Sequence, residues 1–248
     1  MPNAPAIRSV PLAEALAAAT EWWALAGVDE AFADEPRNWL AENDQAEPAS
    51  ASLAAEVAPP AKPPARFGGD PALWPTELHA FDAWWCESEA LSLGSGAPRV
   101  SPRGEAGAAL MVLVPMPEAG DRETLLSGPQ GALVANMLRA MGLADHDVRL
   151  APVLPRHVPA PDWQSMDGLA ELTRHHVALA RPQRLLALGA PLAPLLAPDA
   201  ADPRRLDAVA LPGGSVPAMV GRSPDALLNT PAFRKSLWQR WLAWTAPR

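Results

Sequence analysis

The sequence predicts an α/β fold, a three-layer sandwich with a mostly parallel central sheet, preceded by a helical N-terminal segment. Two observations predict it. From about Asp70 onward, apolar runs of strand length alternate with segments whose apolar residues recur at helical spacing. About half of the 248 residues are hydrophobic, so a chain of this length can bury a substantial core.

Changes in composition divide the chain into three predicted regions. Residues 1–41 form a helical segment, in which Ser9 caps a helix that ends at Gly27 and a second short element follows. Residues 42–69 are rich in Ala, Pro, Glu and Ser, and they cannot bury enough apolar surface to fold alone. We therefore interpret them as a semi-rigid linker. Residues 70–248 form the α/β domain.

The elements of the domain are predicted in chain order from the pattern of apolar residues. They are a helix over 73–93, a buried strand over 109–114, a helix that opens at the Gly-rich turn 127–131 and ends at Gly142, a strand over 148–151, a helix over 167–180, a strand over 184–188, short strands near 208–211 and 216–220, and a helix over 231–244. Ligands of such sheets bind in the crevice beyond the carboxyl ends of the strands. This rule points to the loops that follow Val114, Ala151, Leu188 and Val220.

Charge and cysteine content exclude several classes of site. The formal net charge of −8 disfavours non-specific nucleic-acid binding, although arginine and histidine concentrate in the C-terminal half. The single cysteine, Cys86, excludes an internal disulfide and an all-cysteine metal or iron–sulfur site within one chain. We expect no metal and no cofactor. We also expect a cytoplasmic monomer without membrane association, because the chain shows neither a signal-peptide pattern nor an apolar run of membrane-spanning length.

His175 and His176 are neighbours on a predicted helix. Adjacent helical positions point about 100° apart, so the two rings cannot easily share a metal ion. We expect one of them to be exposed and the other to be packed.

Four segments of the domain form an ordered set of motifs at strand ends and helix starts. They are VLVPMPEAGD (112–121) with SGPQG (127–131), VRLAPVLPRH (148–157), RPQRLLALG (181–189) and SPDALLNTPA (223–232). In order, spacing and context this set resembles the motifs of the iron–sulfur uracil-DNA glycosylases. The resemblance covers the domain from about Asp70 to Arg248. It implies the α/β fold of the uracil-DNA glycosylase superfamily, with DNA as the partner and base excision by hydrolysis of the N-glycosidic bond as the activity.

The side chains that carry this chemistry in the family are replaced here. By resemblance, the family's glutamate, stacking phenylalanine, base-reading asparagine and histidine fall at Val114 or Pro115, Leu126, Pro152 and Ser223. Its four cluster cysteines fall near Cys86, Glu89, Arg156 and Leu169. One thiolate does not hold a four-iron cluster. Two functions are left open: a divergent DNA glycosylase without a cluster, or an inactive relative that acts as a DNA-binding or protein-interaction module.

For the enzyme hypothesis the candidate catalytic residues are Glu118, Asp121 and His157. Either carboxylate, if relocated toward the base, suits the activation of water, and His157 stands where it can replace the missing motif histidine. The alternative for the carboxylates is a solvated loop acid or a helix N-cap near Arg122. For His157 the alternative is a solvated loop residue.

Candidate DNA- and base-binding residues lie in three of the same loops. They are Ser127, Gly128, Gln130 and Gly131 at a helix start, Arg156 after the second strand, and Arg222 with Ser223 before the last helix. Backbone N–H groups at a helix start bind phosphate, and glycines there also serve tight turns. Ser223 is equally suited to capping a helix. Trp22, Trp23 and Trp39 of the N-terminal segment are predicted either to pack on the domain or to bind a protein partner.

Overall fold

The computed structural model describes residues 12–25, 66–94, 96–198, 202 and 206–246. The chain divides into two compact units, Met1–Pro59 and Pro60–Arg248. In the first unit helix α1 spans Leu12–Leu25, where the sequence predicts a helix. The second predicted N-terminal element lies outside the described residues. Across the part of the chain that the structure describes, no helix combines the length and apolar character needed to cross a membrane.

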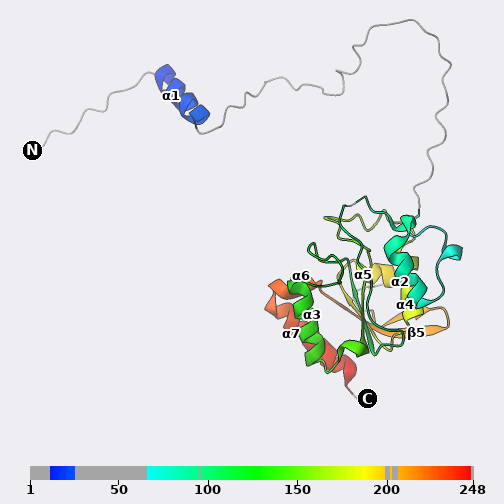
Figure 1. Ribbon diagram of the computed structural model, residues 1–248. Helices are drawn as coiled ribbons and strands as arrows, with labels where there is room; N and C mark the ends of the chain where they lie inside the picture. The colour runs from blue at the N-terminus through cyan, green and yellow to red at the C-terminus, as the bar shows by residue number, and fades with distance from the viewer. Residues whose placement is uncertain (1–11, 26–65, 95, 199–201, 203–205, 247–248) are drawn as a thin grey trace, which may run out of the picture. The chain divides into compact units, whose positions relative to one another are not determined.

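The second unit is built on a five-stranded sheet (Figure 1). Its strands are β1 (Leu110–Val114), β2 (Val148–Pro152), β3 (Leu185–Leu188), β4 (Ala208–Leu211) and β5 (Gly214–Gly221). They lie in the order β2-β1-β3-β5-β4; only β4 is antiparallel to its neighbour. The predicted α/β class with a mostly parallel sheet is therefore confirmed.

Helices cover both faces of the sheet, which gives three layers (Figure 1). One face packs on α2 (Leu78–Glu87), α4 (Leu169–Ala180) and α5 (Leu192–Leu196), and the other on α3 (Pro129–Ala140), α6 (Pro224–Asn229) and α7 (Pro231–Thr245). Successive residues of β1 alternate between the two cores: Met111 and Leu113 join the first, and Val112 and Val114 the second. This two-sided burial explains why β1 reads as an uninterrupted apolar run.

The helix predicted over 73–93 is divided in the structure. A 3₁₀ turn, Pro71–Leu73, precedes α2, and another, Glu89–Leu91, follows it. Trp74 is extended because a residue before proline is driven out of the helical region. Ser88 is also extended, and its side chain accepts a hydrogen bond from the Ala90 N–H, which starts the second turn.

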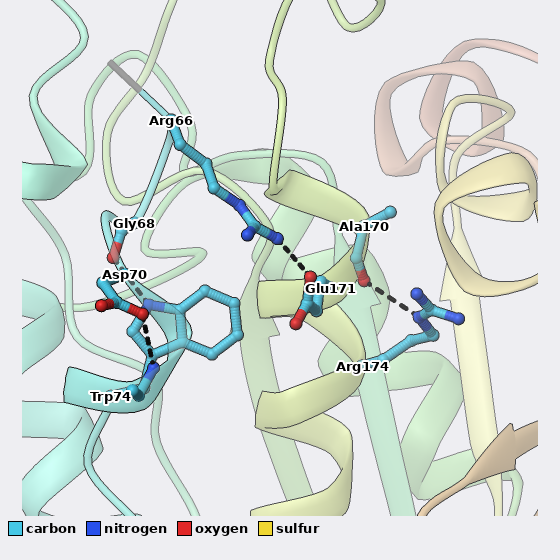
Figure 2. Close-up of polar contacts among 8 residues, drawn as sticks. Arg66, Gly68, Asp70, Trp74, Ala170, Glu171 and Arg174 are labelled. Carbon is cyan, nitrogen blue, oxygen red and sulfur yellow. Dashed lines mark hydrogen bonds and ion pairs between the residues drawn. The ribbon is translucent and has the colours of Figure 1, made fainter.

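The domain begins nearer to the N-terminus than the predicted linker end at residue 69. Phe67 is buried, and its N–H donates to the Asp167 carbonyl over 2.8 Å. Trp74 Nε1 donates to the Gly68 carbonyl over 2.6 Å, and Arg66 forms an ion pair with Glu171 (Figure 2). One buried aromatic side chain thus ties this segment to the core, although the composition around it is that of a linker.

One charged side chain, Arg149 of β2, is fully buried. Its Nη2 donates to Asp82 of α2 and lies 3.0 Å from His176 Nε2 of α4, and its Nη1 donates to the Gly104 carbonyl. As the adjacent positions predict, His176 is buried whereas His175 is partly exposed. This network joins β2 to the two helices packed on one face of the sheet.

Burial of His176 makes stability depend on pH. Desolvation first, and then the charges of Arg149 and His175, hold its pKa well below the ordinary value. The folded state therefore keeps this ring neutral while the unfolded chain takes up a proton below about pH 6.5. The free energy of unfolding is expected to fall as pH drops through that value, by up to about 1.4 kcal/mol per pH unit from this group.

Urea unfolding at pH 7.5 and 5.5 measures this effect. His176→Gln keeps an acceptor for Arg149 and does not titrate, so the variant should lose less stability than the wild type between the two pH values. His146→Gln is the control, because the His146 side chain is 84% exposed. An equal loss in the wild type and His176→Gln would contradict the assignment.

Candidate functional site

The loops that follow β1 and β2 run side by side at the carboxyl edge of the sheet. Parallel pairing continues past the strand ends, since the N–H groups of Val153 and Leu154 donate to the carbonyls of Val114 and Pro115, each over 2.9 Å. Farther along the same edge, the Gly189 N–H donates to the Gly221 carbonyl over 3.1 Å. The predicted location of a site at this edge therefore coincides with a continuous row of loops.

The Glu118 carboxylate caps the start of α3. Its Oε1 accepts from the N–H groups of Gly128 (3.1 Å) and Gly131 (2.9 Å), and its Oε2 accepts from that of Gln130 (3.2 Å). A helix start presents free N–H groups and a partial positive charge, and both favour an anion. The anion here is the protein's own side chain, which occupies the place where the sequence allows either phosphate binding or a tight turn.

One glycine of this turn is required by close packing. A Cβ on Gly131 would lie 1.8 Å from the Leu126 carbonyl oxygen, and one on Gly128 would lie 2.6 Å from Glu118 Oε2. The position of Gly131 therefore has room only for glycine, because the clash there is with backbone, whereas the atoms beside Gly128 belong to the end of a side chain that can shift. The contact at Gly131 is in keeping with the tight-turn interpretation. Ser127 belongs to the same turn and bonds to Asp121 rather than to the helix start.

Asp121 is buried within the loop that follows β1, with an exposed fraction of only 2%. Its Oδ2 accepts from the N–H groups of Glu118 and Leu126, both over 2.8 Å. Its Oδ1 accepts from the Ser127 N–H over 2.8 Å and from the Ser127 hydroxyl over 2.7 Å. These bonds also hold Leu126 at a φ of 57°, a left-handed conformation that costs energy for a residue with a Cβ. A shielded carboxylate with four donors is suited to organising a loop rather than to activating water.

Basic groups gather beside the carboxyl end of β2. His157 Nδ1 lies 3.0 Å from the Pro117 carbonyl, which links the second loop to the loop of Glu118. Arg99 enters the same region because the neighbouring Val100 N–H donates to the Pro155 carbonyl over 2.8 Å. Burial first, and then the charge of Arg156, lower the pKa of Arg99. The charge of the Arg156 guanidinium therefore acts on Arg99 at this edge.

Arg99 is not among the site residues predicted from the sequence. It lies outside the four motifs, in a segment with no helical or strand periodicity. Only the antiparallel contact of that segment with β2, seen also in the bridge between Arg103 and Leu150, brings it to the site. A single backbone bridge of this kind leaves no pattern in the sequence, so the position of Arg99 could not be predicted from it.

Arg222 and Ser223 lie at a different place on the edge. Ser223 Oγ accepts from the Ala226 N–H over 3.3 Å and caps α6, as the alternative interpretation predicts. The Arg222 guanidinium lies 4.9 Å from the centre of the Phe233 ring. In the strand order, β5 is three strands from β2, roughly 14 Å at the usual spacing. The structure therefore does not bring these two residues together with Arg156.

At the base of the edge the side chains are apolar. Val114 and Pro152 are register partners at the ends of β1 and β2, and both are buried. Leu126 is buried in the same hydrophobic core as Val114, on the face of the sheet that packs on α3, α6 and α7. Within the described residues, no group of three or more His, Cys, Asp and Glu side chains is placed to hold a metal ion. Neither protein-family models nor curated proteins give a match to this chain.

Proposed function

We propose that this chain is a catalytically inactive relative of the uracil-DNA glycosylases that binds DNA through the loops at the carboxyl edge of its sheet. The four ordered motifs support the kinship, and the mostly parallel three-layer architecture is compatible with it. DNA is the partner class because the same edge that carries the motif loops also carries the basic groups beside β2.

The observation that carries the proposal is the pair Arg99 and Arg156. The charge of Arg156 contributes to lowering the pKa of Arg99, after burial, and an anion that contacts both groups is attracted by both. Arg99 Nη1 is held by the Cys86 carbonyl over 3.1 Å, and its Nε is buried with no hydrogen-bond partner among the described residues. Phosphate fits two guanidinium groups by both geometry and charge. A DNA backbone supplies that phosphate.

The chemistry of excision is poorly supported at this edge. The carboxylate oxygens of Glu118 and Asp121 already accept hydrogen bonds from backbone N–H groups of the first loop and of the turn at the start of α3. Val114 cannot activate water, and Pro152 has no side-chain group that reads a base. The residues that remain are suited to holding a phosphate, which positions a protein on DNA without reading its sequence.

Arg156→Gln should weaken the binding of DNA by the full chain. Fluorescence anisotropy with labelled single- and double-stranded oligonucleotides measures the affinity at several salt concentrations. Loss of one phosphate contact should weaken binding several-fold and reduce the slope of log K against log salt by about 0.9 on duplex DNA.

Arg139→Gln is the matched control, since it removes the same charge from an exposed residue in the last turn of α3. That change should leave both the affinity and the slope within error of the wild type. An absence of DNA binding at low salt, or equal losses in the two variants, would overturn the proposal.

A further inference from the structure

A cavity of about 580 Å³ lies at the opposite, amino edge of the sheet. Its walls come from the start of α2, from residues 102–106 and from the end of α4. Gly104 places the cavity at this edge, because it packs against Val148, the first residue of β2: a Cβ on Gly104 would lie 2.3 Å from the Val148 carbonyl oxygen. Arg181, which follows α4 and precedes β3, lines the same cavity.

Asp82 is the least exposed charged residue of this lining. Its Oδ1 accepts from Arg149, while its Oδ2 has no hydrogen-bond partner among the described residues. The side chain is 23% exposed, so one carboxylate oxygen is left for a ligand while the other is fixed. Burial raises the pKa of this carboxyl, and the Arg149 bond opposes the rise.

Arg149 stands directly behind the lining. It is fully buried, and its two terminal nitrogens donate to Asp82 and to Gly104, both of which line the cavity. Its Nε is buried with no hydrogen-bond partner in the described part of the chain. A charged side chain placed in a core is costly and is often retained for a role other than stability. Here it fixes the orientation of the one partly buried carboxylate that faces the cavity.

The remaining charges of the lining are exposed and of both signs. Glu105 and His79 act electrostatically on Asp82, so they lie near it. Arg103 and Arg181 add two cations to the same lining. The lining thus holds carboxylate acceptors and guanidinium donors, which together complement a ligand that carries both a cation and an anion.

We propose that this cavity binds a small organic zwitterion of the cationic amino-acid type. A guanidinium or ammonium group of the ligand donates to Asp82 Oδ2 and to Glu105. Its carboxylate meets Arg103 or Arg181. The site is separate from the carboxyl edge and does not depend on the DNA proposal.

Isothermal titration of the full chain with L-arginine and L-lysine tests this site, with L-citrulline and agmatine as matched probes. Citrulline keeps the shape of arginine without its cationic end, and agmatine lacks the carboxylate. Arginine or lysine should bind, and citrulline and agmatine should each bind at least about tenfold more weakly than arginine. No heat from arginine and lysine at millimolar concentration, or equal affinity for citrulline, would overturn the proposal.

Two variants separate the site from folding. Asp82→Asn should abolish arginine binding, and because this change also disturbs the Arg149 network, Glu105→Gln provides a second, exposed position. Glu105→Gln should weaken binding about tenfold while leaving the urea midpoint unchanged. Glu123→Gln removes the same charge from the exposed loop at the carboxyl edge and should have no effect. Equal effects of the two glutamate variants would also contradict the proposal.

Discussion

Asp121→Asn is expected to lower the free energy of unfolding by about 3 kcal/mol or more. The carboxylate accepts four hydrogen bonds inside a shielded loop, three of them from backbone N–H groups. An asparagine amide offers one acceptor oxygen and places a donor against the remaining N–H groups. Each buried N–H left without a partner costs about 1–3 kcal/mol. The strained φ of Leu126 also loses part of what holds it.

Urea unfolding followed by circular dichroism measures this change. Asp145→Asn is the control, because Asp145 is exposed and its side chain makes no hydrogen bond or ion pair within the described residues. That control should remain within about 0.5 kcal/mol of the wild type. A loss below 1 kcal/mol in Asp121→Asn would mean that the loop does not depend on this carboxylate.

Arg149→Met is expected to cost about 3–5 kcal/mol, since removing one member of a buried ion pair leaves its partners without compensation. The change deprives Asp82, His176 and the Gly104 carbonyl of their shared donor. Methionine has a similar length and fills most of the space, so the loss reports on polar groups rather than on a cavity.

A double variant, Asp82→Leu with Arg149→Met, tests the cause of that loss. Replacing both members of a buried pair by apolar residues is often close to neutral. The double variant should therefore recover part of the stability lost in the single one, whereas Arg139→Met on the exposed end of α3 should cost little. A double variant less stable than Arg149→Met would contradict the assignment of the loss to the unpaired carboxylate.

The architecture could be predicted from the sequence because burial on both faces leaves a clear pattern. The residues of β1, β2 and β3 are all buried, and each strand reads as a compact, mainly apolar run. Short helices were harder to predict. Helix α5 (Leu192–Leu196) contains Pro194 and is too short to show a period. Helix α6 (Pro224–Asn229) was not predicted as an element of its own; Thr230, extended before Pro231, separates it from α7, which begins where the predicted helix over 231–244 begins.

The candidate site could be predicted in position but not in detail. The motif loops do lie at the carboxyl edge, where Asp121 accepts from the Glu118 N–H and His157 Nδ1 lies beside the Pro117 carbonyl. What the sequence could not specify is which donor each carboxylate meets, because a loop acid and a catalytic acid have the same residue type. Their hydrogen bonds to the turn 127–131 depend on a fold of the loop that no local pattern encodes.

Neither Arg99 nor the amino-edge cavity could be predicted. Asp82, Glu105 and Arg181 come from three separate segments, and only the packing of α2 and α4 beside β2 brings them together. The buried Arg149 likewise reads in the sequence as an ordinary basic residue at the start of a strand. Residues that are distant in the chain meet through the topology, which a single sequence does not reveal.

Single-turnover excision by the full chain distinguishes an inactive DNA-binding protein from a glycosylase. Enzyme in excess is incubated with single- and double-stranded DNA that contains uracil, hypoxanthine or xanthine, at a salt concentration where anisotropy shows the DNA to be bound. We expect binding without release of any base. Release by the wild type that is lost in Glu118→Gln, with the fold of the variant retained, would contradict it and would identify a glycosylase that uses this carboxylate.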